Sequence, residues 1–164
     1  MIRLCSLSKC GRYRYSLERR LPDVVGPTLC WLMLNPSTAD ATRDDPTIRK
    51  VVGFTRRAGY GSALVVNLFA WRATDPRELR DSPAEGARNR AAVIRAASVS
   101  DAVVCAWGAT PWAREQAVRV LRWLAARSGA KKSPLLCLGR TKHGAPRHPL
   151  MLSYADHPLV PFAS

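Results

Sequence analysis

The chain has 164 residues, a length typical of one domain, and its 47% hydrophobic content is enough to fill one core. Lysine and arginine total 26 against 12 aspartates and glutamates, which leaves a formal charge of +14. This excess is larger than solubility requires and predicts binding to polyanions, with a plain solvated basic surface as the alternative. No apolar run reaches membrane-spanning length and the N-terminus lacks the apolar region of a secretory signal, so we expect a cytoplasmic protein with no membrane contact.

The N-terminal part of the chain, residues 1–28, is rich in charge and predicts a hairpin or edge strand. Residues 29–34 (LCWLML) form the first continuous apolar run, which is typical of a strand covered on both faces. The run stops at residues 35–40, where proline, serine and threonine favour a turn. The Asp-Pro pair at 45–46 then supplies an N-cap and a first-turn proline for a helix.

Three more apolar runs follow, and a helical pattern precedes each of them. The runs occupy residues 63–68, 102–106 and 135–138, and the later helical patterns occupy residues 84–97 and the segment that begins at Thr110. Parallel strands need helical crossovers, so this alternation predicts an α/β fold. We expect one three-layer α/β/α domain over residues 1–164, with a mostly parallel four-stranded central sheet.

The five cysteines divide between apolar and polar surroundings. Cys30, Cys105 and Cys137 lie inside apolar runs, which predicts that they are packing residues in a reducing compartment. Cys5 and Cys10 could contribute to a metal or iron–sulfur site, but no close C-x-x-C pair accompanies them. We therefore expect neither a metal nor a cofactor.

Polar residues follow each of the predicted strands. Asn35, Asn67 and Gly108 come at or just after the ends of three of them, and a loop with His143 and His148 follows the fourth. In parallel sheets ligands bind outside the carboxyl ends of the strands. Four segments of the chain therefore converge on one rim, which predicts a site there.

Each of these residues also has a structural explanation. Asn35 before a proline is common in turns, and Asn67 could serve only to satisfy loop amides. The histidines could ligate a metal, although no carboxylate or cysteine lies near them at a recognisable ligand spacing. Trp71 and Trp107 could be core aromatics.

Five strings cover nearly the whole chain: LNPSTAD (34–40), DDPTIR (44–49), VVNLFAWRATDP (65–76), AWG (106–108) and TKHGAPRHPL (141–150). They resemble a widespread bacterial and phage family of uncharacterised function, a domain of unknown function. The order of these motifs further resembles the uracil-DNA glycosylase superfamily. That resemblance implies a uracil-DNA glycosylase-like fold and a base-excising activity.

The superfamily resemblance also implies roles for single residues. There, the first strand ends in a water-positioning Asp or Asn followed by proline, which Asn35 and Pro36 match. A later strand ends in an asparagine that reads the flipped base, which Asn67 matches, and a His-Pro-Ser loop carries the catalytic histidine, which His148 matches. His143 is a second candidate for the catalytic donor.

The match to the superfamily is incomplete at two places. Residues 150–151 (Leu-Met) replace the serine and the DNA-inserting residues of the usual loop, which puts insertion into a duplex in doubt. Ser37 stands where an aromatic often shields the uracil pocket, so a different or larger base is an alternative. Gly108 matches a Trp-Gly that ends a strand in some members, and Phe69 or Trp71 could either stack on a base or pack in the core.

The residues suit this chemistry on physical grounds as well. Breaking an N-glycosidic bond builds positive charge on the sugar and negative charge on the departing base. His148 could donate to the base, Asn35 could hold the water more feebly than a carboxylate would, and Asn67 offers a donor and an acceptor to a pyrimidine edge. Candidates for phosphate contacts are Arg140, Lys142 and Arg147, followed by Arg43 and Arg72.

Three functions remain open on the sequence. The first is a glycosylase-like hydrolase that excises a modified or damaged base. The second is an enzyme of the same fold that acts on free nucleotides or on another nucleic-acid modification, and the third is a non-catalytic nucleic-acid-binding module. The expected partner is DNA, single- or double-stranded, with RNA left open, and the sequence indicates no obligate protein partner.

Overall fold

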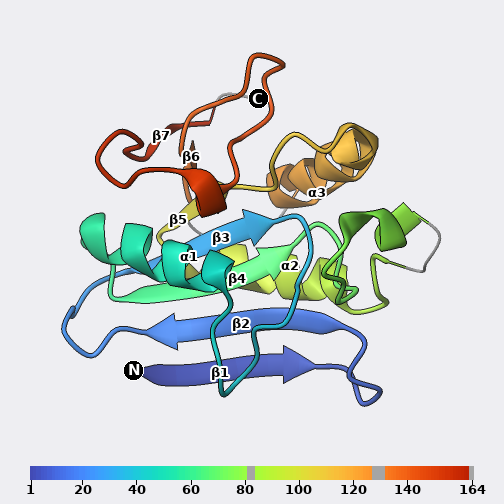
Figure 1. Cartoon of the computed structure of the whole chain (residues 1–164), viewed down its shortest axis with the longest axis horizontal. Coiled ribbons are helices and arrows are strands. Elements are labelled where there is room, and N and C mark those ends of the chain that lie inside the picture. The colour runs from blue at the N-terminus through green and yellow to red at the C-terminus, as the bar shows by residue number, and fades with distance from the viewer. Residues whose placement is uncertain (81–83, 127–131, 163–164) are drawn as a thin grey trace.

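The computed structural model describes residues 1–80, 84–126 and 132–162, and the strands of this part of the chain form one seven-stranded sheet (Figure 1). The spatial order is β1-β2-β4-β3-β5-β6-β7. The four central strands β4, β3, β5 and β6 pair in parallel with their neighbours. At one edge β2 pairs antiparallel with β4 and β1 with β2, and at the other edge β7 pairs antiparallel with β6. The strands are β1 (Ile2–Leu7), β2 (Arg14–Arg20), β3 (Thr28–Met33), β4 (Ser62–Asn67), β5 (Ala102–Cys105), β6 (Leu135–Cys137) and β7 (Val160–Pro161).

The fold is mixed α/β, as the alternating pattern predicts, but the sheet is larger than the expected four strands. The four apolar runs form the parallel strands within about one residue of the expected bounds. The hairpin of β1 and β2 extends the sheet beside β4, and β7 extends it beside β6. These three strands lack the continuous apolar runs that mark the central ones, because each has a more exposed face.

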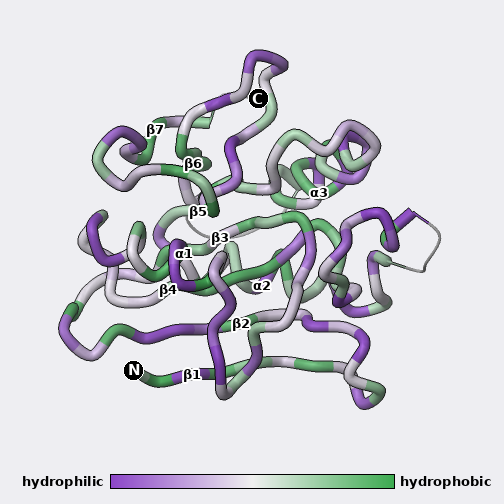
Figure 2. Tube along the Cα trace, viewed as in Figure 1, coloured by the Kyte–Doolittle hydropathy of each residue, from purple (hydrophilic) through white to green (hydrophobic). Residues whose placement is uncertain are grey.

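Helix α1 (Pro46–Arg57) covers one face of the sheet, and α2 (Asn89–Val99) and α3 (Arg114–Ala126) cover the other (Figure 1). The Asp45 side chain accepts a hydrogen bond from the Ile48 amide at 2.8 Å, so the expected N-cap of α1 is confirmed. Figure 2 shows the hydrophobic residues concentrated along the central strands, with hydrophilic residues in the surrounding loops. None of the helices in the described ranges has the length and apolar character needed to cross a membrane.

Helix α2 begins at Asn89, five residues later than the pattern from residue 84 predicts. The backbone explains the delay, because the carbonyls of Ala84 and Glu85 accept hydrogen bonds from Trp71 and Ala70 instead of helical amides. Gly86 follows with φ of 79°, a conformation that ends any helical path. Pairing with the loop after β4 therefore overrides the helical propensity of residues 84–88.

Buried polar groups tie α1 to the sheet. The indole nitrogen of Trp31, a fully buried residue of β3, donates to the Thr55 hydroxyl at 2.9 Å. That hydroxyl donates in turn to the Val51 carbonyl at 2.8 Å. Cys30, Cys105 and Cys137 are buried in the opposite core, in agreement with their predicted packing role.

Replacing Thr55 by valine preserves the shape of the side chain but leaves the Trp31 indole N–H buried without an acceptor. We expect the free energy of unfolding to fall by about 1–3 kcal/mol. Urea denaturation monitored by tryptophan fluorescence measures this change. Thr110→Val, at a hydroxyl that makes no capping hydrogen bond, is the matched control and is expected to change stability by less; equal losses in the two variants would contradict the assignment.

Candidate functional site

The predicted rim lies where β3, β4 and β5 end. These strands are parallel neighbours, so their carboxyl ends meet at one edge of the sheet. The chain leaves β3 toward α1 on one face and leaves β5 toward α3 on the other face. In open α/β sheets, ligands bind at the edge where two such loops diverge.

Asn35 lies at the end of β3 and is oriented by two hydrogen bonds. Its Nδ2 donates to the Pro36 carbonyl at 3.0 Å and to the Ala73 carbonyl at 2.8 Å. These bonds hold the loops after β3 and β4 together, so Asn35 does have a structural role. They use the amide nitrogen alone, and no hydrogen bond within the described chain engages Oδ1, which therefore remains able to accept from a water or a ligand.

His148 reaches the same edge from the loop after β6. A Cβ added to Gly108 would lie 3.4 Å from the His148 Cβ, and the Gly108 amide donates to the Pro146 carbonyl at 3.1 Å. Gly108 has φ of 80°, which side chains rarely adopt. Glycine after Trp107 is thus the residue that lets the histidine loop approach β5.

The imidazole of His148 is held as a neutral donor. Burial lowers the pKa of His148, and the partly opposing influence of the Asp45 carboxylate does not restore it. The Leu150 amide donates to Nδ1 at 3.3 Å, so the neutral ring carries its proton on Nε2. His148 therefore offers an N–H donor without a full positive charge.

His143 does not join His148. Residues 139–147 form a tight hairpin in which the Thr141 amide donates to the Ala145 carbonyl at 2.8 Å, and His143 is exposed at its tip. The same hairpin carries three of the predicted phosphate-binding residues on its surface: Arg140, Lys142 and Arg147. In Figure 1 this hairpin rises above β6, and Figure 2 shows that its tip is hydrophilic.

Asn67 is the least explained polar residue of the site. It ends β4, is 1% exposed, and neither its Nδ2 nor its Oδ1 has a hydrogen-bond partner in the described chain. The nearby loop carbonyls are instead satisfied by Asn89, whose Nδ2 donates to the carbonyls of Asn67 and Leu68. The Asn67 side chain therefore does not serve to satisfy loop amides, and a buried amide left unpaired costs about 1–3 kcal/mol.

The remaining predicted contacts are spread around the rim. Phe69 is half-buried against Trp112, with ring centroids 5.8 Å apart, whereas Trp71 packs edge-on against Tyr13 at 5.3 Å. Trp107 is a core aromatic packed on Phe162.

The backbone of the loop after β3 is hydrogen-bonded to other segments of the protein. The Pro36 carbonyl accepts from the Ala73 amide at 3.0 Å, and the Ser37 carbonyl accepts from Nε of Arg72 at 3.3 Å. Arg72 also reaches the Gly11 carbonyl, so its guanidinium is engaged within the protein. Arg43 is exposed beside this loop, with Nε directed to the Thr38 carbonyl at 3.4 Å.

Sequence reasoning missed Arg14, the first residue of β2. Its side chain is buried at the same edge of the sheet, where Nη1 donates to the Ala39 carbonyl at 2.9 Å. Burial lowers the pKa of Arg14 to about 10. Arginine is mostly exposed in proteins, so nothing in the charged N-terminal sequence distinguishes Arg14 from its exposed neighbours.

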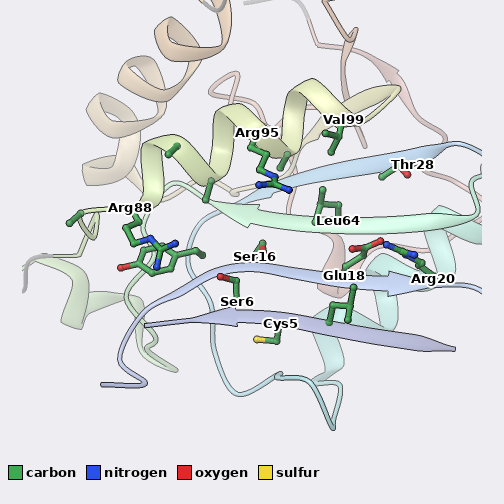
Figure 3. A pocket seen from close by; sticks show the side chains of 16 residues that line it. Cys5, Ser6, Ser16, Glu18, Arg20, Thr28, Leu64, Arg88, Arg95 and Val99 are labelled. Atoms are coloured by element: carbon green, nitrogen blue, oxygen red, sulfur yellow. The ribbon is translucent and has the colours of Figure 1, made fainter. Parts of the chain in front are cut away.

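A separate groove lies on the opposite face from α1, between α2 and the β1–β2 hairpin (Figure 3). Glu18 and Arg20 pair across its floor, whereas Arg88 and Arg95 project from α2 and form no ion pair in the described chain. Arg88 lies over the ring of Tyr15, 5.6 Å from its centroid. No predicted site residue lines this groove.

The structure thus defines a mixed α/β protein with a polar site at the carboxyl edge of its parallel strands. The chain belongs to the family described as "Protein of unknown function (DUF1643)", whose model matches residues 14–150. Membership of an uncharacterised family is confirmed in this way. No curated protein and no solved structure matches the chain.

The lowered pKa of His148 has a measurable consequence for stability. The unfolded chain takes up a proton on this histidine at higher pH than the folded chain does, so stability decreases as the pH falls below the ordinary histidine pKa of about 6.5. Asp45→Asn keeps a helix-capping side chain but removes the charge that raises this pKa, so we expect the pKa of His148 to fall further. Titration of its ring proton by NMR measures the pKa in each protein, and urea denaturation at two pH values measures the change in stability. A higher pKa in the variant, or a stability that does not fall with pH, would contradict these expectations.

Proposed function

We propose that the chain is a nucleic-acid-acting hydrolase that cleaves the N-glycosidic bond of a modified or damaged base, in the manner of the uracil-DNA glycosylases it resembles. The observation that carries the proposal is Asn67, a buried amide with both polar atoms unpaired at the ligand-binding edge. An amide presents a donor and an acceptor side by side, which matches the edge of a pyrimidine. The unpaired state of both atoms favours a ligand of that kind over a purely structural role.

The fold is compatible with this assignment. The central parallel strands β4, β3, β5 and β6 have α1 on one face and α2 and α3 on the other. This part of the molecule supports the four-stranded, three-layer arrangement that the resemblance implies, and β1, β2 and β7 are additions at its edges.

The reaction divides among three side chains. Nε2 of the neutral His148 donates a hydrogen bond to the base as negative charge develops there. Oδ1 of Asn35 holds the attacking water, because Nδ2 is already used by two backbone carbonyls. An amide cannot take the proton of that water as a carboxylate can, so the enzyme works best on a base that leaves readily.

Access to the base depends on surface residues beside His148. Extrusion of a base from a duplex costs a few kcal/mol of unstacking, which the cationic hairpin of Arg140, Lys142 and Arg147 can offset through phosphate contacts. Met151, 89% exposed, follows His148 in the short 3₁₀ turn Pro149–Met151. Residues 150–151 do not match the usual inserting residues of the superfamily, but an exposed apolar side chain at this place can still occupy the space between stacked bases, as methionine does in other proteins that bend DNA.

The test uses oligonucleotides that carry uracil, hypoxanthine, 5-hydroxymethyluracil or phage-type modified pyrimidines, in single and double strands. Abasic sites are scored by alkaline cleavage. We expect cleavage of at least one substrate, with His148→Ala lowering the rate about 10²–10⁴-fold because the donor is lost. Asn35→Ala and Asn67→Ala are expected to lower it as well, whereas His143→Ala, at the exposed hairpin tip, leaves it unchanged.

Two results would overturn this assignment. Binding of every oligonucleotide without an abasic site would remove the glycosylase activity for those bases. Release of base from free nucleosides or nucleotides alone would instead support an enzyme of the same fold with a nucleotide-level substrate. Loss of cleavage in His143→Ala but not in His148→Ala would transfer the donor role to the hairpin tip.

The groove between α2 and the β1–β2 hairpin favours a second candidate, a module that binds nucleic acid without chemistry. Arg88, the N-cap residue of α2, and Arg95 within the helix lie seven positions apart, so they project from the same side about 10 Å apart along the helix axis. Two such cations suit the phosphate backbone of a single strand (Figure 3).

Replacing Arg88 and Arg95 together by glutamine tests this groove. We expect weaker binding of a single-stranded oligonucleotide, and a salt dependence whose slope falls by about 0.7 for each phosphate that the variant no longer neutralises. Arg49→Gln, an exposed cation on α1 at the opposite face, is the matched control. Equal weakening in both proteins, measured by fluorescence anisotropy across a salt series, would show a diffuse charge effect and no groove.

A further inference from the structure

Arg14 and Asn67 lie on adjacent strands near one edge of the sheet. Arg14 is the first residue of β2 and Asn67 the last residue of β4, and these strands are antiparallel partners. The Arg14 amide donates to the Ala70 carbonyl at 2.9 Å, three residues beyond Asn67. Both residues therefore lie at the edge of the sheet where the candidate site is.

Both side chains lie on the face that α1 covers. Arg14 donates to the carbonyl of Ala39, which belongs to the core under α1. Asn67 is two positions after Val65, a member of the same core, and alternate residues of a strand point to the same face. Asp45 is close enough to influence the charge of both Arg14 and His148, which connects the three groups electrostatically.

Arg14 differs sharply from the other buried arginine of β2. Arg19 is 0% exposed and pairs with Asp44, with Nε 2.7 Å from Oδ1. Arg14 is 2% exposed, forms no ion pair in the described chain, and its Nε has no hydrogen-bond partner. Arg14 keeps its hydrogen bond to the Ala39 carbonyl but has no counter-ion, and a buried charge without a counter-ion is destabilising. This environment points to an anion that arrives from outside.

The nearest carboxylate does not fill this role. Asp45 accepts from the Ile48 amide at 2.8 Å through Oδ1 and from the Ala39 amide at 3.3 Å through Oδ2. Burial is the main cause of the lowered pKa of Arg14; Cys5 and Asp45 oppose it in part, whereas Arg72 and Arg19 add positive potential and lower the pKa further. The surroundings of Arg14 thus favour an added negative charge.

We propose that Arg14 and Asn67 form a site for the anionic form of a pyrimidine base, an inference that rests on the proposed function. When the glycosidic bond breaks, its electron pair passes to the ring nitrogen of the base. The oxygen of the attacking water bonds to the sugar carbon, and its proton leaves to solvent. His148 is neutral and adds no full charge, so the guanidinium of Arg14 balances the charge of the departing base while Asn67 pairs with its edge.

The experiment measures binding of free bases to the full chain by titration calorimetry, from neutral to mildly alkaline pH. Uracil and the more acidic 5-fluorouracil are the probes. We expect affinity to rise with pH as each base loses its ring proton, with the rise at lower pH for 5-fluorouracil. Arg14→Gln is expected to abolish this rise and to weaken binding of the anion about 10–100-fold.

Two further variants keep the test decisive if Arg14→Gln folds poorly. Arg14→Lys retains the positive charge and is expected to keep the rise with pH at reduced affinity. Asn67→Asp places a carboxylate beside Arg14, so we expect a higher melting temperature and loss of the preference for the anion. Arg49→Gln, an exposed cation on α1, controls for the overall charge and is expected to bind as the parent does.

The outcomes separate this inference from the proposed activity. Binding that does not depend on pH, that persists unchanged in Arg14→Gln, or that is absent for both bases overturns the anion site, whatever the oligonucleotide assay shows. Binding that rises with pH and is lost in Arg14→Gln supports it, even if no oligonucleotide is cleaved. In that case the glycosylase activity is rejected while the anion site stands.

Discussion

β3 is hydrogen-bonded in parallel to β4 on one side and to β5 on the other. This pairing determines where the loops and side chains of the candidate site lie. It brings three strand ends to one edge and sends the loops after β3 and β5 over opposite faces. The places of Asn35 and Asn67 follow directly from it, since Asn67 ends β4 and Asn35 lies two residues beyond the end of β3. His148 joins them because Gly108, just beyond β5, allows the last loop to approach.

Some polar groups buried near that edge have partners and others do not. Arg19 and Asp44 neutralise each other a short distance away, and Trp31 and Thr55 satisfy each other under α1. Arg14 and Asn67 are equally buried but leave polar atoms unpaired. A protein keeps such atoms at a cost to stability, and ligand sites are where that cost is recovered by binding.

The same environment determines which of these side chains carry a charge. Burial keeps His148 neutral, Asn35 carries no charge, and Arg14 keeps its own charge despite burial because its lowered pKa, about 10, remains well above neutral pH. The positive charge at this edge therefore resides on Arg14 and not on His148. Electrostatic stabilisation of this preorganised kind acts strongly where water is excluded.

The sequence by itself determined the central strands, the capped start of α1 and the position of Asn35 and Asn67 at the ends of strands, because apolar runs, caps and turns are local signals. Tertiary structure decided the rest. The place of the β1–β2 hairpin beside β4, the addition of β7 and the late start of α2 depend on pairing with distant segments. The separation of His143 from His148 depends on how the 139–147 hairpin folds. The burial of Arg14 was decided by the loop that covers it, since an arginine in a charged segment carries no local sign that it will be enclosed.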